Sequence, residues 1–241
     1  MKRAFDIVFS IIGLTILSPL LLPVMFLVWM QDRHSPFYIA PRVGMGGLPF
    51  QMVKLRSMVI NADKIGASST SNADRRITGV GRFIRKYKLD ELMQLWNVAL
   101  GDMSLVGPRP QVRSGVELYT DRERELLTVR PGITDFASIV FSDEGTILED
   151  SKDPDADYDL LIRPWKSRLG LIYISNQSLW LDINLIALTI LAVISKRRAL
   201  NGVERLLLIC RAPAKVIDVS RRQGILAPSL PPDSGWETKD R

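Results

Sequence analysis

Two adjacent carboxylates, Asp90 and Glu91, lie in a part of the chain that is rich in basic residues. A carboxylate can attack phosphorus as a nucleophile, and clustered Arg and Lys side chains bind the phosphate groups that such a nucleophile would attack. Acidic residues here also suit an ordinary helix N-terminus, because they complement the helix dipole. The pair alone leaves both roles open. The basic residues around it are Arg82, Arg85, Lys86, Lys88 and Arg109.

A second feature, Arg109 between Pro108 and Pro110, favours phosphate chemistry. Prolines on both sides fix the backbone around the arginine, so its guanidinium loses less conformational freedom when it binds a ligand. The alternative is a turn that happens to contain an arginine. We interpret Arg109 as a phosphate-binding residue that acts with the carboxylate pair.

Composition restricts the other possible chemistries. The 241 residues carry a formal net charge of +6, which favours anionic partners such as phospholipid surfaces, nucleotides or nucleic acid. Cys210 and His34 are the only residues of their types, which excludes an internal disulfide, a cysteine-based zinc site and a histidine-rich metal site. Neither common glycine-rich nucleotide-binding loop occurs. Carboxylates remain the candidate nucleophiles and acid–base groups.

The carboxylate pair is expected to open an amphipathic helix. Asp90 falls on a different face from the apolar residues of this helix. Before it, Thr78 can cap a basic helix that covers residues 79–87 and contains Arg85. The apolar residues that recur at helical spacing, and so predict the buried face, are Leu89, Leu92, Met93 and Trp96.

Lys54 lies in a predicted β-hairpin. Apolar residues at 37–39 and 49–55 flank a glycine-rich segment at 44–47, a pattern typical of two strands joined by a turn. We interpret the glycines as turn residues rather than as a phosphate-binding loop.

The remaining chain predicts further helices and several polar segments. Residues 160–173 and 183–194 have helical patterns, and the second is too short to cross a bilayer comfortably. The polar segment 61–74 predicts a mobile loop, whereas the acidic segment 143–159 predicts a solvated surface. From Ala212 onward, prolines and charges predict a poorly ordered tail.

An uncharged apolar segment runs from Ile7 to Met30 and is long enough to cross a hydrocarbon core as a helix. Ser18 and Pro19 lie in its middle; the proline should bend the helix sharply, and the serine hydroxyl can satisfy a freed carbonyl group. Basic residues flank both ends, which favours a cytoplasmic position for both. Charge and proline alone leave a re-entrant and a spanning helix open.

Several stretches, read in order, carry a specific resemblance: Lys54-Leu55-Arg56-Ser57-Met58 and residues 81–86, 89–92, 94–98, 101–110 and 130–134. With them, the chain resembles the bacterial sugar transferase family, the small monotopic phosphoglycosyl transferases, from its first residue to about residue 195. The family commonly has proline where Met93 stands, and Gly-Trp where Asp135 and Phe136 stand. Asp135 adds negative charge to a loop near the predicted site.

The resemblance implies a reaction and roles for individual residues. A sugar-1-phosphate would pass from a nucleoside diphosphate sugar, usually a UDP-sugar, to polyprenyl (undecaprenyl) phosphate, with release of UMP. Asp90 would be the nucleophile and a Mg²⁺ ligand, and Glu91 would assist proton transfer or positioning. The family's positively charged active-site positions match Lys54, Arg85 and Arg109.

We therefore predict an α/β fold that is mainly helical. Residues 1–33 would form a re-entrant membrane helix, broken at Ser18 and Pro19, as the resemblance implies. Residues 34–200 would form a compact catalytic domain with a small β-hairpin and interfacial amphipathic helices, and residues 201–241 a partly disordered extension. The enzyme would be monotopic in the bacterial inner membrane, with its catalytic domain facing the cytoplasm.

The expected partners are a UDP-sugar, polyprenyl phosphate, membrane phospholipid and downstream glycosyltransferases. The reaction would be the first membrane step of a surface glycan, such as a capsule, exopolysaccharide, O-antigen or glycoprotein glycan. A non-catalytic scaffold on the membrane surface is the main alternative. A nucleic-acid binder is disfavoured, because no stretch interleaves exposed aromatic with basic residues. The residues specify neither the sugar nor the oligomeric state.

Overall fold

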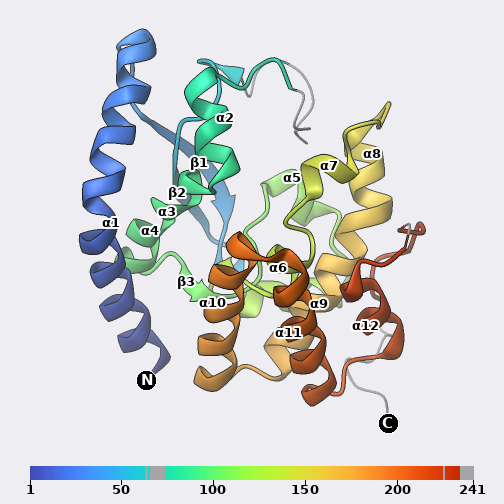
Figure 1. Cartoon of the computed structure of the whole chain (residues 1–241). Helices are drawn as coiled ribbons and strands as arrows, with labels where there is room; N and C mark the ends of the chain where they lie inside the picture. The colour runs from blue at the N-terminus through green and yellow to red at the C-terminus, as the bar shows by residue number, and fades with distance from the viewer. Residues whose placement is uncertain (63–64, 66–73, 225, 234–241) are drawn as a thin grey trace.

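The protein is mainly helical, with two small sheets, in a computed structural model that describes residues 1–62, 65, 74–224 and 226–233 (Figure 1). The predicted mobile loop at 61–74 lies mostly outside these residues. The strands are β1 (Phe37–Val43), β2 (Pro49–Leu55), β3 (Ser104–Val106) and β4 (Gly132–Thr134). The first helices are α1 (Lys2–Asp32), η1 (Met45–Gly47), α2 (Gly79–Lys86), α3 (Leu89–Leu92), α4 (Gln94–Leu100) and α5 (Arg113–Glu117). The others are η3 (Glu123–Thr128), α6 (Phe136–Val140), α7 (Glu144–Ile147), α8 (Pro154–Asp157), η4 (Tyr158–Ile162), α9 (Arg163–Ser175), α10 (Leu179–Ile194), α11 (Lys196–Ile209) and α12 (Ala214–Arg221).

Helix α1 is the one helix among the described residues that is long and apolar enough to cross a membrane. It runs unbroken for 31 residues through Pro19 and Pro23, and its ribbon curves along its length (Figure 1). Pro19 cannot donate to the Thr15 carbonyl, but the Ser18 hydroxyl donates to that oxygen at 2.8 Å. The predicted hydrogen bond from the Ser18 hydroxyl to a carbonyl freed by Pro19 is confirmed. The predicted break is not present as a gap, because the helix continues past the proline.

Both ends of α1 are fixed to the rest of the protein. Near its start, Asp6 accepts hydrogen bonds from the Leu105 amide at 3.1 Å and the Ser104 hydroxyl at 2.9 Å. Lys2 forms an ion pair with buried Asp182 at 2.6 Å. At the other end, Asp32 pairs with Arg56. Between these contacts, α1 shares one apolar cluster with the following elements, formed by Leu21, Val24, Val28, Leu55, Ile84 and Leu89.

The two sheets support the segments that carry the predicted site. Strands β1 and β2 form the predicted antiparallel hairpin, in which Lys54 pairs with Tyr38. Strands β3 and β4 are parallel and pair Val106 with Thr134. Thr78 caps α2 by accepting a hydrogen bond from the Gly81 amide at 2.9 Å, as predicted. The predicted later helices are present as α9 and α10.

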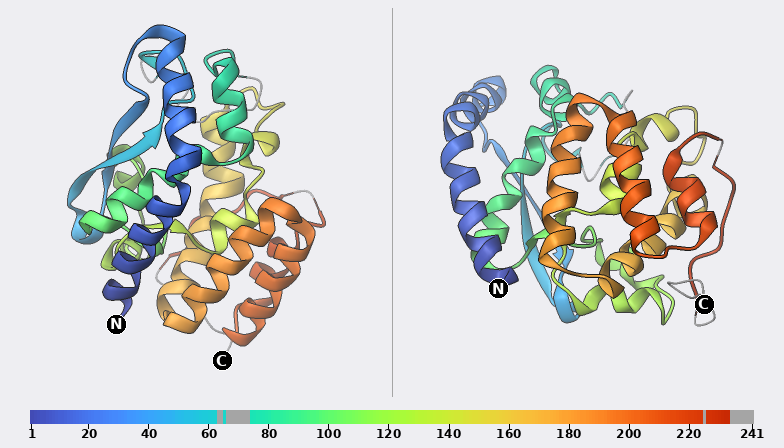
Figure 2. Two further views of the ribbon diagram at one scale, coloured as in Figure 1. Left: turned by 60° about the vertical axis from the view of Figure 1, so that its left-hand side comes forward. Right: turned by 60° about the horizontal axis from the view of Figure 1, so that its bottom comes forward.

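The C-terminal helices contribute to the main core on both sides of the predicted boundary at residue 200. Helix α11 begins at Lys196 and continues across that boundary, and α12 continues helical structure to Arg221 (Figure 2). Prolines and charges from Ala212 onward predicted a poorly ordered tail, yet α12 is helical to Arg221 and its apolar residues Val216 and Ile217 face inward. The buried residues of this region are Ala199, Leu200, Val203, Leu206, Leu207, Cys210, Ala212, Val216 and Ile217.

Candidate active site

The carboxylate pair lies on the short helix α3. Lys88 precedes this helix in a left-handed backbone conformation, with φ of 56°. Asp90 is largely enclosed, and its Oδ1 atom is buried with no hydrogen-bond partner in the described part of the chain. A buried carboxylate oxygen without a partner is costly unless a ligand or ion completes it. Asp90 therefore has a carboxylate oxygen that remains available to a ligand, an ion or a reacting group.

Glu91, in contrast, is held by cations. Its Oε1 atom accepts a hydrogen bond from Arg109 at 2.5 Å and lies 4.0 Å from the Lys54 ammonium. The hairpin supplies Lys54 and the turn after β3 supplies Arg109, so the two sheets meet at this carboxylate. The structure thus joins four of the residues that the sequence analysis selected.

The two neighbouring carboxyl groups have different electrostatic environments. Burial raises the pKa of Asp90, and the charge of Glu91 adds to this effect. Burial acts in the same direction on Glu91, but Arg109 and Lys54 outweigh it and lower the pKa of Glu91 to about 2. Burial lowers the pKa of Lys54 to about 8, assisted by the charge of Arg109. Glu91 is thus firmly ionised at neutral pH.

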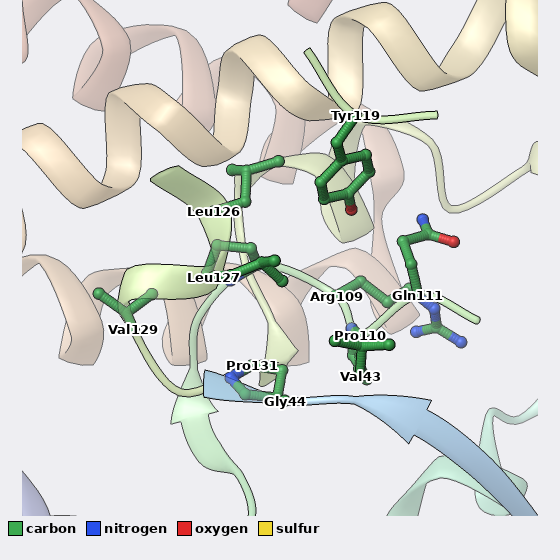
Figure 3. Close-up of a pocket in the computed structure, with 11 residues that line it drawn as sticks. Val43, Gly44, Arg109, Pro110, Gln111, Tyr119, Leu126, Leu127, Val129 and Pro131 are labelled. Carbon is green, nitrogen blue, oxygen red and sulfur yellow. The ribbon is translucent and has the colours of Figure 1, made fainter. Parts of the chain in front are cut away.

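Close backbone contact fixes the turn that carries Arg109. Gly107 and Gly132 approach so closely that a Cβ atom on Gly132 would lie 2.0 Å from the Gly107 nitrogen. The turn also lines a small, largely apolar pocket, in which the Tyr119 ring points towards Pro110 (Figure 3). The proline-flanked arginine therefore rests on a supported backbone, in agreement with the sequence interpretation.

Arg85 is the predicted phosphate-binding residue that the structure does not bring to the pair. It lies on α2, and its charge acts on Asp74. No hydrogen bond or ion pair joins Arg85 to Asp90 or Glu91, and all three residues are described. A role for Arg85 stays a prediction.

Two further cations belong to the site: Arg42, which the sequence analysis did not consider, and Lys88, which it noted beside the pair without giving it a role. Burial lowers the pKa of Arg42, the charge of Arg109 adds to this effect, and the charge of Arg42 in turn contributes to the lowered pKa of Lys54. Arg42 lies four residues after Tyr38, the strand partner of Lys54, so the hairpin register could have placed it on the same face. The charge of Lys88 partly opposes the raised pKa of Asp90 and adds to the lowered pKa of Glu91.

A third cation, Lys166, comes from α9. It forms an ion pair with Glu144 and lies 5.0 Å from the centre of the Tyr158 ring. Gln111, two residues after Arg109, donates a hydrogen bond to the Tyr158 hydroxyl at 3.2 Å. The charge of Glu144 also acts on Arg109, so the acidic segment 143–159 contributes to the site as well as to the surface. No local sequence signal places Lys166 here, because the contact joins distant parts of the chain.

The helix after Asp90 and Glu91, which we call the dyad, differs from its predicted pattern. Helices α3 and α4 meet at Met93, and the buried face changes there, so Trp96 is 50% exposed instead of lying in the core. Asn97 is buried in its place. Its side chain accepts from the Val53 amide at 2.9 Å and donates to the Gln51 carbonyl at 2.7 Å. Asn97 thus ties α4, the helix that follows the carboxylate pair, to the strand that carries Lys54.

Asp135 and Phe136, which depart from the family pattern, have local roles. Asp135 caps α6: its side chain accepts a hydrogen bond from the Ser138 amide at 2.7 Å, and the Ser138 hydroxyl accepts one from the Asp135 amide. Burial raises the pKa of Asp135. Phe136 is fully buried in the main core. The carboxylate is therefore engaged in capping a helix.

The donor set suits one divalent ion that is completed by a substrate. The described residues contain no cluster of three or more His, Cys, Asp or Glu side chains able to enclose a metal. The unpartnered Asp90 oxygen nevertheless offers one hard oxygen ligand. Mg²⁺ prefers oxygen ligands and commonly takes only one or two carboxylates together with substrate phosphates. Asp90 fits such an ion.

The fold is a mainly helical domain with a long apolar helix, and its site is a carboxylate pair among cations. These features agree with the class of protein that the sequence resembles. The chain matches the bacterial sugar transferase family over residues 1–196, and it belongs to that family. A UDP-N-acetylgalactosamine-undecaprenyl-phosphate N-acetylgalactosaminephosphotransferase of Aeromonas hydrophila is 37% identical over 198 residues, or 80% of this chain and 44% of the relative.

Two other relatives carry related names. An undecaprenyl-phosphate glucose phosphotransferase of Komagataeibacter xylinus is 40% identical over 205 residues, or 82% of this chain and 36% of the relative. A UDP-glucose:undecaprenyl-phosphate glucose-1-phosphate transferase of Caulobacter vibrioides is 32% identical over 201 residues, or 82% of this chain and 71% of the relative. The chain thus spans less than half of the first two relatives.

Proposed function

We propose that this protein transfers a sugar-1-phosphate from a UDP-sugar to undecaprenyl phosphate, releasing UMP. The observation that carries the proposal is the buried, unpartnered Asp90 oxygen beside Glu91, Arg109 and Lys54. A free nucleophilic oxygen and fixed cations are what displacement at an anionic phosphorus requires. The names of the relatives supply the substrate classes.

The reaction would proceed in two displacements. An Asp90 carboxylate oxygen attacks the phosphorus that bears the sugar; a new P–O bond forms, the bond to the UMP oxygen breaks, and UMP leaves. A phosphate oxygen of undecaprenyl phosphate then attacks the same phosphorus, and the bond to Asp90 breaks. The products are undecaprenyl-diphosphate sugar and the regenerated carboxylate.

The surrounding residues would lower the electrostatic cost of both displacements. Arg109 and Lys54 offset the charge of the phosphates, and Glu91 orients these two cations while remaining ionised. Mg²⁺, held by Asp90 and substrate oxygens, would supply further charge neutralisation at the diphosphate. Arg42 and Lys88 extend the positive surroundings on either side.

The same proposal includes a membrane position. Helix α1 would lie in one leaflet of the bacterial inner membrane, with both ends and the catalytic domain on the cytoplasmic side. The attachment of both helix ends to one domain supports this arrangement. At that depth the site would face the phosphate of the lipid acceptor, and the product would enter surface glycan synthesis through downstream glycosyltransferases.

The nucleophile is tested by Asp90→Asn in detergent-purified full-length protein. Wild-type protein incubated with Mg²⁺ and a UDP-sugar panel should gain the mass of a sugar phosphate on the peptide that contains Asp90. The variant should gain none and should release at least roughly 10³-fold less UMP in turnover with undecaprenyl phosphate, because an amide is a poor nucleophile.

Asp121→Asn is the matched control, since the Asp121 side chain is fully exposed. It should behave as the wild type. Full activity of Asp90→Asn would refute the assigned nucleophile. Absence of UMP release from wild-type protein with every donor would favour the membrane scaffold instead.

A further inference from the structure

We propose that helices α11 and α12 position the active site through one ion cluster, in which Lys196 and Arg222 hold Asp143. This inference rests on the proposed function, because the groups it positions surround the same dyad. The family match ends at residue 196, so these two helices lie almost entirely beyond it. We refer to Asp143, Lys196 and Arg222 as the C-terminal clamp.

The clamp joins both ends of the two-helix unit to a single carboxylate. Lys196, the first residue of α11, places its ammonium 2.5 Å from Asp143 Oδ2. Arg222, which ends α12 in a left-handed conformation, places its guanidinium 3.5 Å from the same oxygen. The Arg222 guanidinium also lies 5.6 Å from the centre of the Phe141 ring. A shift of the unit would therefore either break these contacts or move Asp143.

The residues on either side of Asp143 reach the active site. The Ser142 carbonyl accepts a hydrogen bond from Lys88 at 3.4 Å, and Lys88 acts electrostatically on both members of the dyad. Glu144 forms an ion pair with Lys166, and its charge reaches Arg109. Three consecutive residues thus contact the C-terminal helices and two cations of the site.

The clamp is sensitive to the loss of a single charge. Within the described chain, Asp143 Oδ1 and Arg222 Nε are buried and have no hydrogen-bond partner. Charge attraction, rather than a complete hydrogen-bond network, therefore holds the cluster together. Removing one partner from such a cluster leaves the other charge incompletely compensated. The segment at 142–144 should then leave its position, and Lys88 should lose its carbonyl contact.

The test uses Arg222→Gln and Asp143→Asn in the full chain, with Arg221→Gln as the matched control. Arg221 is adjacent in sequence but pairs with Glu204 at 2.7 Å and Asp218 at 2.8 Å, away from the clamp. Hydrogen–deuterium exchange measured by mass spectrometry reports the position of the clamp without requiring turnover. We expect faster exchange in the peptides covering 142–149 and 86–93 in both clamp variants and not in Arg221→Gln.

Turnover provides the second measurement. The clamp variants should lower kcat about fivefold, with KM for the UDP-sugar nearly unchanged. Arg222→Lys keeps the positive charge and should therefore retain most of the wild-type kcat. Faster exchange at 142–149 without faster exchange at 86–93 would overturn the coupling to the dyad. So would an equal increase in exchange over α9, or an unchanged kcat. A wild-type protein without turnover would refute the proposed function, while exchange at 86–93 would still decide the clamp.

Discussion

At the scale of single residues, the two adjacent carboxylates have opposite environments. Glu91 is ionised and bound by Arg109, whereas Asp90 retains an unpartnered oxygen and a raised pKa. Titratable neighbours whose pKa values are driven apart commonly have separate roles in catalysis. The sequence analysis left Glu91 between proton transfer and positioning. A pKa of about 2 makes Glu91 a poor base, and its hydrogen bond from Arg109 favours a positioning role.

Arg109→Lys tests whether the shape of the cation matters as well as its charge. A lysine ammonium cannot hold Glu91 and a substrate phosphate with the planar geometry of a guanidinium. We expect kcat/KM for the UDP-sugar to fall about 10- to 100-fold, which corresponds to the loss of one charge-assisted hydrogen bond. Arg113→Lys, at an exposed ion pair with Glu117, is the control. Equal kcat/KM in both variants would place Arg109 outside the phosphate site.

The lowered pKa of Lys54 predicts a basic limb in the pH profile. Lys54 is a cation below pH 8 and becomes neutral as the pH rises through its pKa of about 8. If the cation binds substrate phosphate as proposed, kcat/KM of the wild type should decline above about pH 8, and Lys54→Arg should retain its own kcat/KM at higher pH. The measurement is kcat/KM from pH 6.5 to 9.5. Identical profiles would show that Lys54 does not control this limb.

Sequence reasoning found the residues with distinctive local patterns and missed those that depend on long-range folding. Asp90, Glu91 and Arg109 stood out through adjacency and flanking prolines, and they meet in the structure. Lys166 could not be found, because α9 reaches the site only through tertiary packing. Trp96 was misplaced because the helix pattern was continued through Met93, where the buried face changes.

At the scale of elements, the parallel pair β3–β4 fixes the arginine turn through its glycines. A Cβ atom on Gly107 would lie 2.5 Å from the Arg130 carbonyl oxygen, and that neighbour is backbone and cannot rotate away. The glycine requirement thus comes from close approach of two chain segments. Such approach is invisible in a sequence without knowledge of the strand pairing.

Gly107→Ala should therefore impair stability and activity together. The forced backbone shift should cost about 2 kcal/mol and lower Tm by roughly 4–8 °C, while kcat/KM falls because Arg109 moves. Gly79→Ala is the control, since a Cβ atom there meets nothing within 4 Å at the start of α2. Thermal unfolding in detergent and UMP release measure the two effects. Equal Tm values for both variants would contradict the close approach.

At the scale of the whole molecule, α1 lies along the domain instead of projecting from it (Figures 1 and 2). Its 31 residues extend about 46 Å at the usual helical rise, and contacts at both ends tie it to one domain. One face packs on the domain. The other carries exposed apolar residues, including Val8, Phe9, Ile12, Ile16, Leu20, Leu22, Phe26 and Leu27. Composition revealed the apolar helix, but only packing reveals that both ends return to the same unit.

That packing predicts that both ends of α1 lie on one side of the membrane, and cysteine labelling can test it. Cysteines introduced at exposed Ala4 and His34, in a Cys210→Ala background, should both react with a membrane-impermeant maleimide in inverted inner-membrane vesicles and not in intact cells. Ile16→Cys is the control: its side chain is 70% exposed in the structure, so low reactivity there reports cover by lipid. A spanning helix would give opposite accessibility at positions 4 and 34. That result would require the contacts of Lys2 or Asp32 to break, because one domain cannot bind both ends across a bilayer.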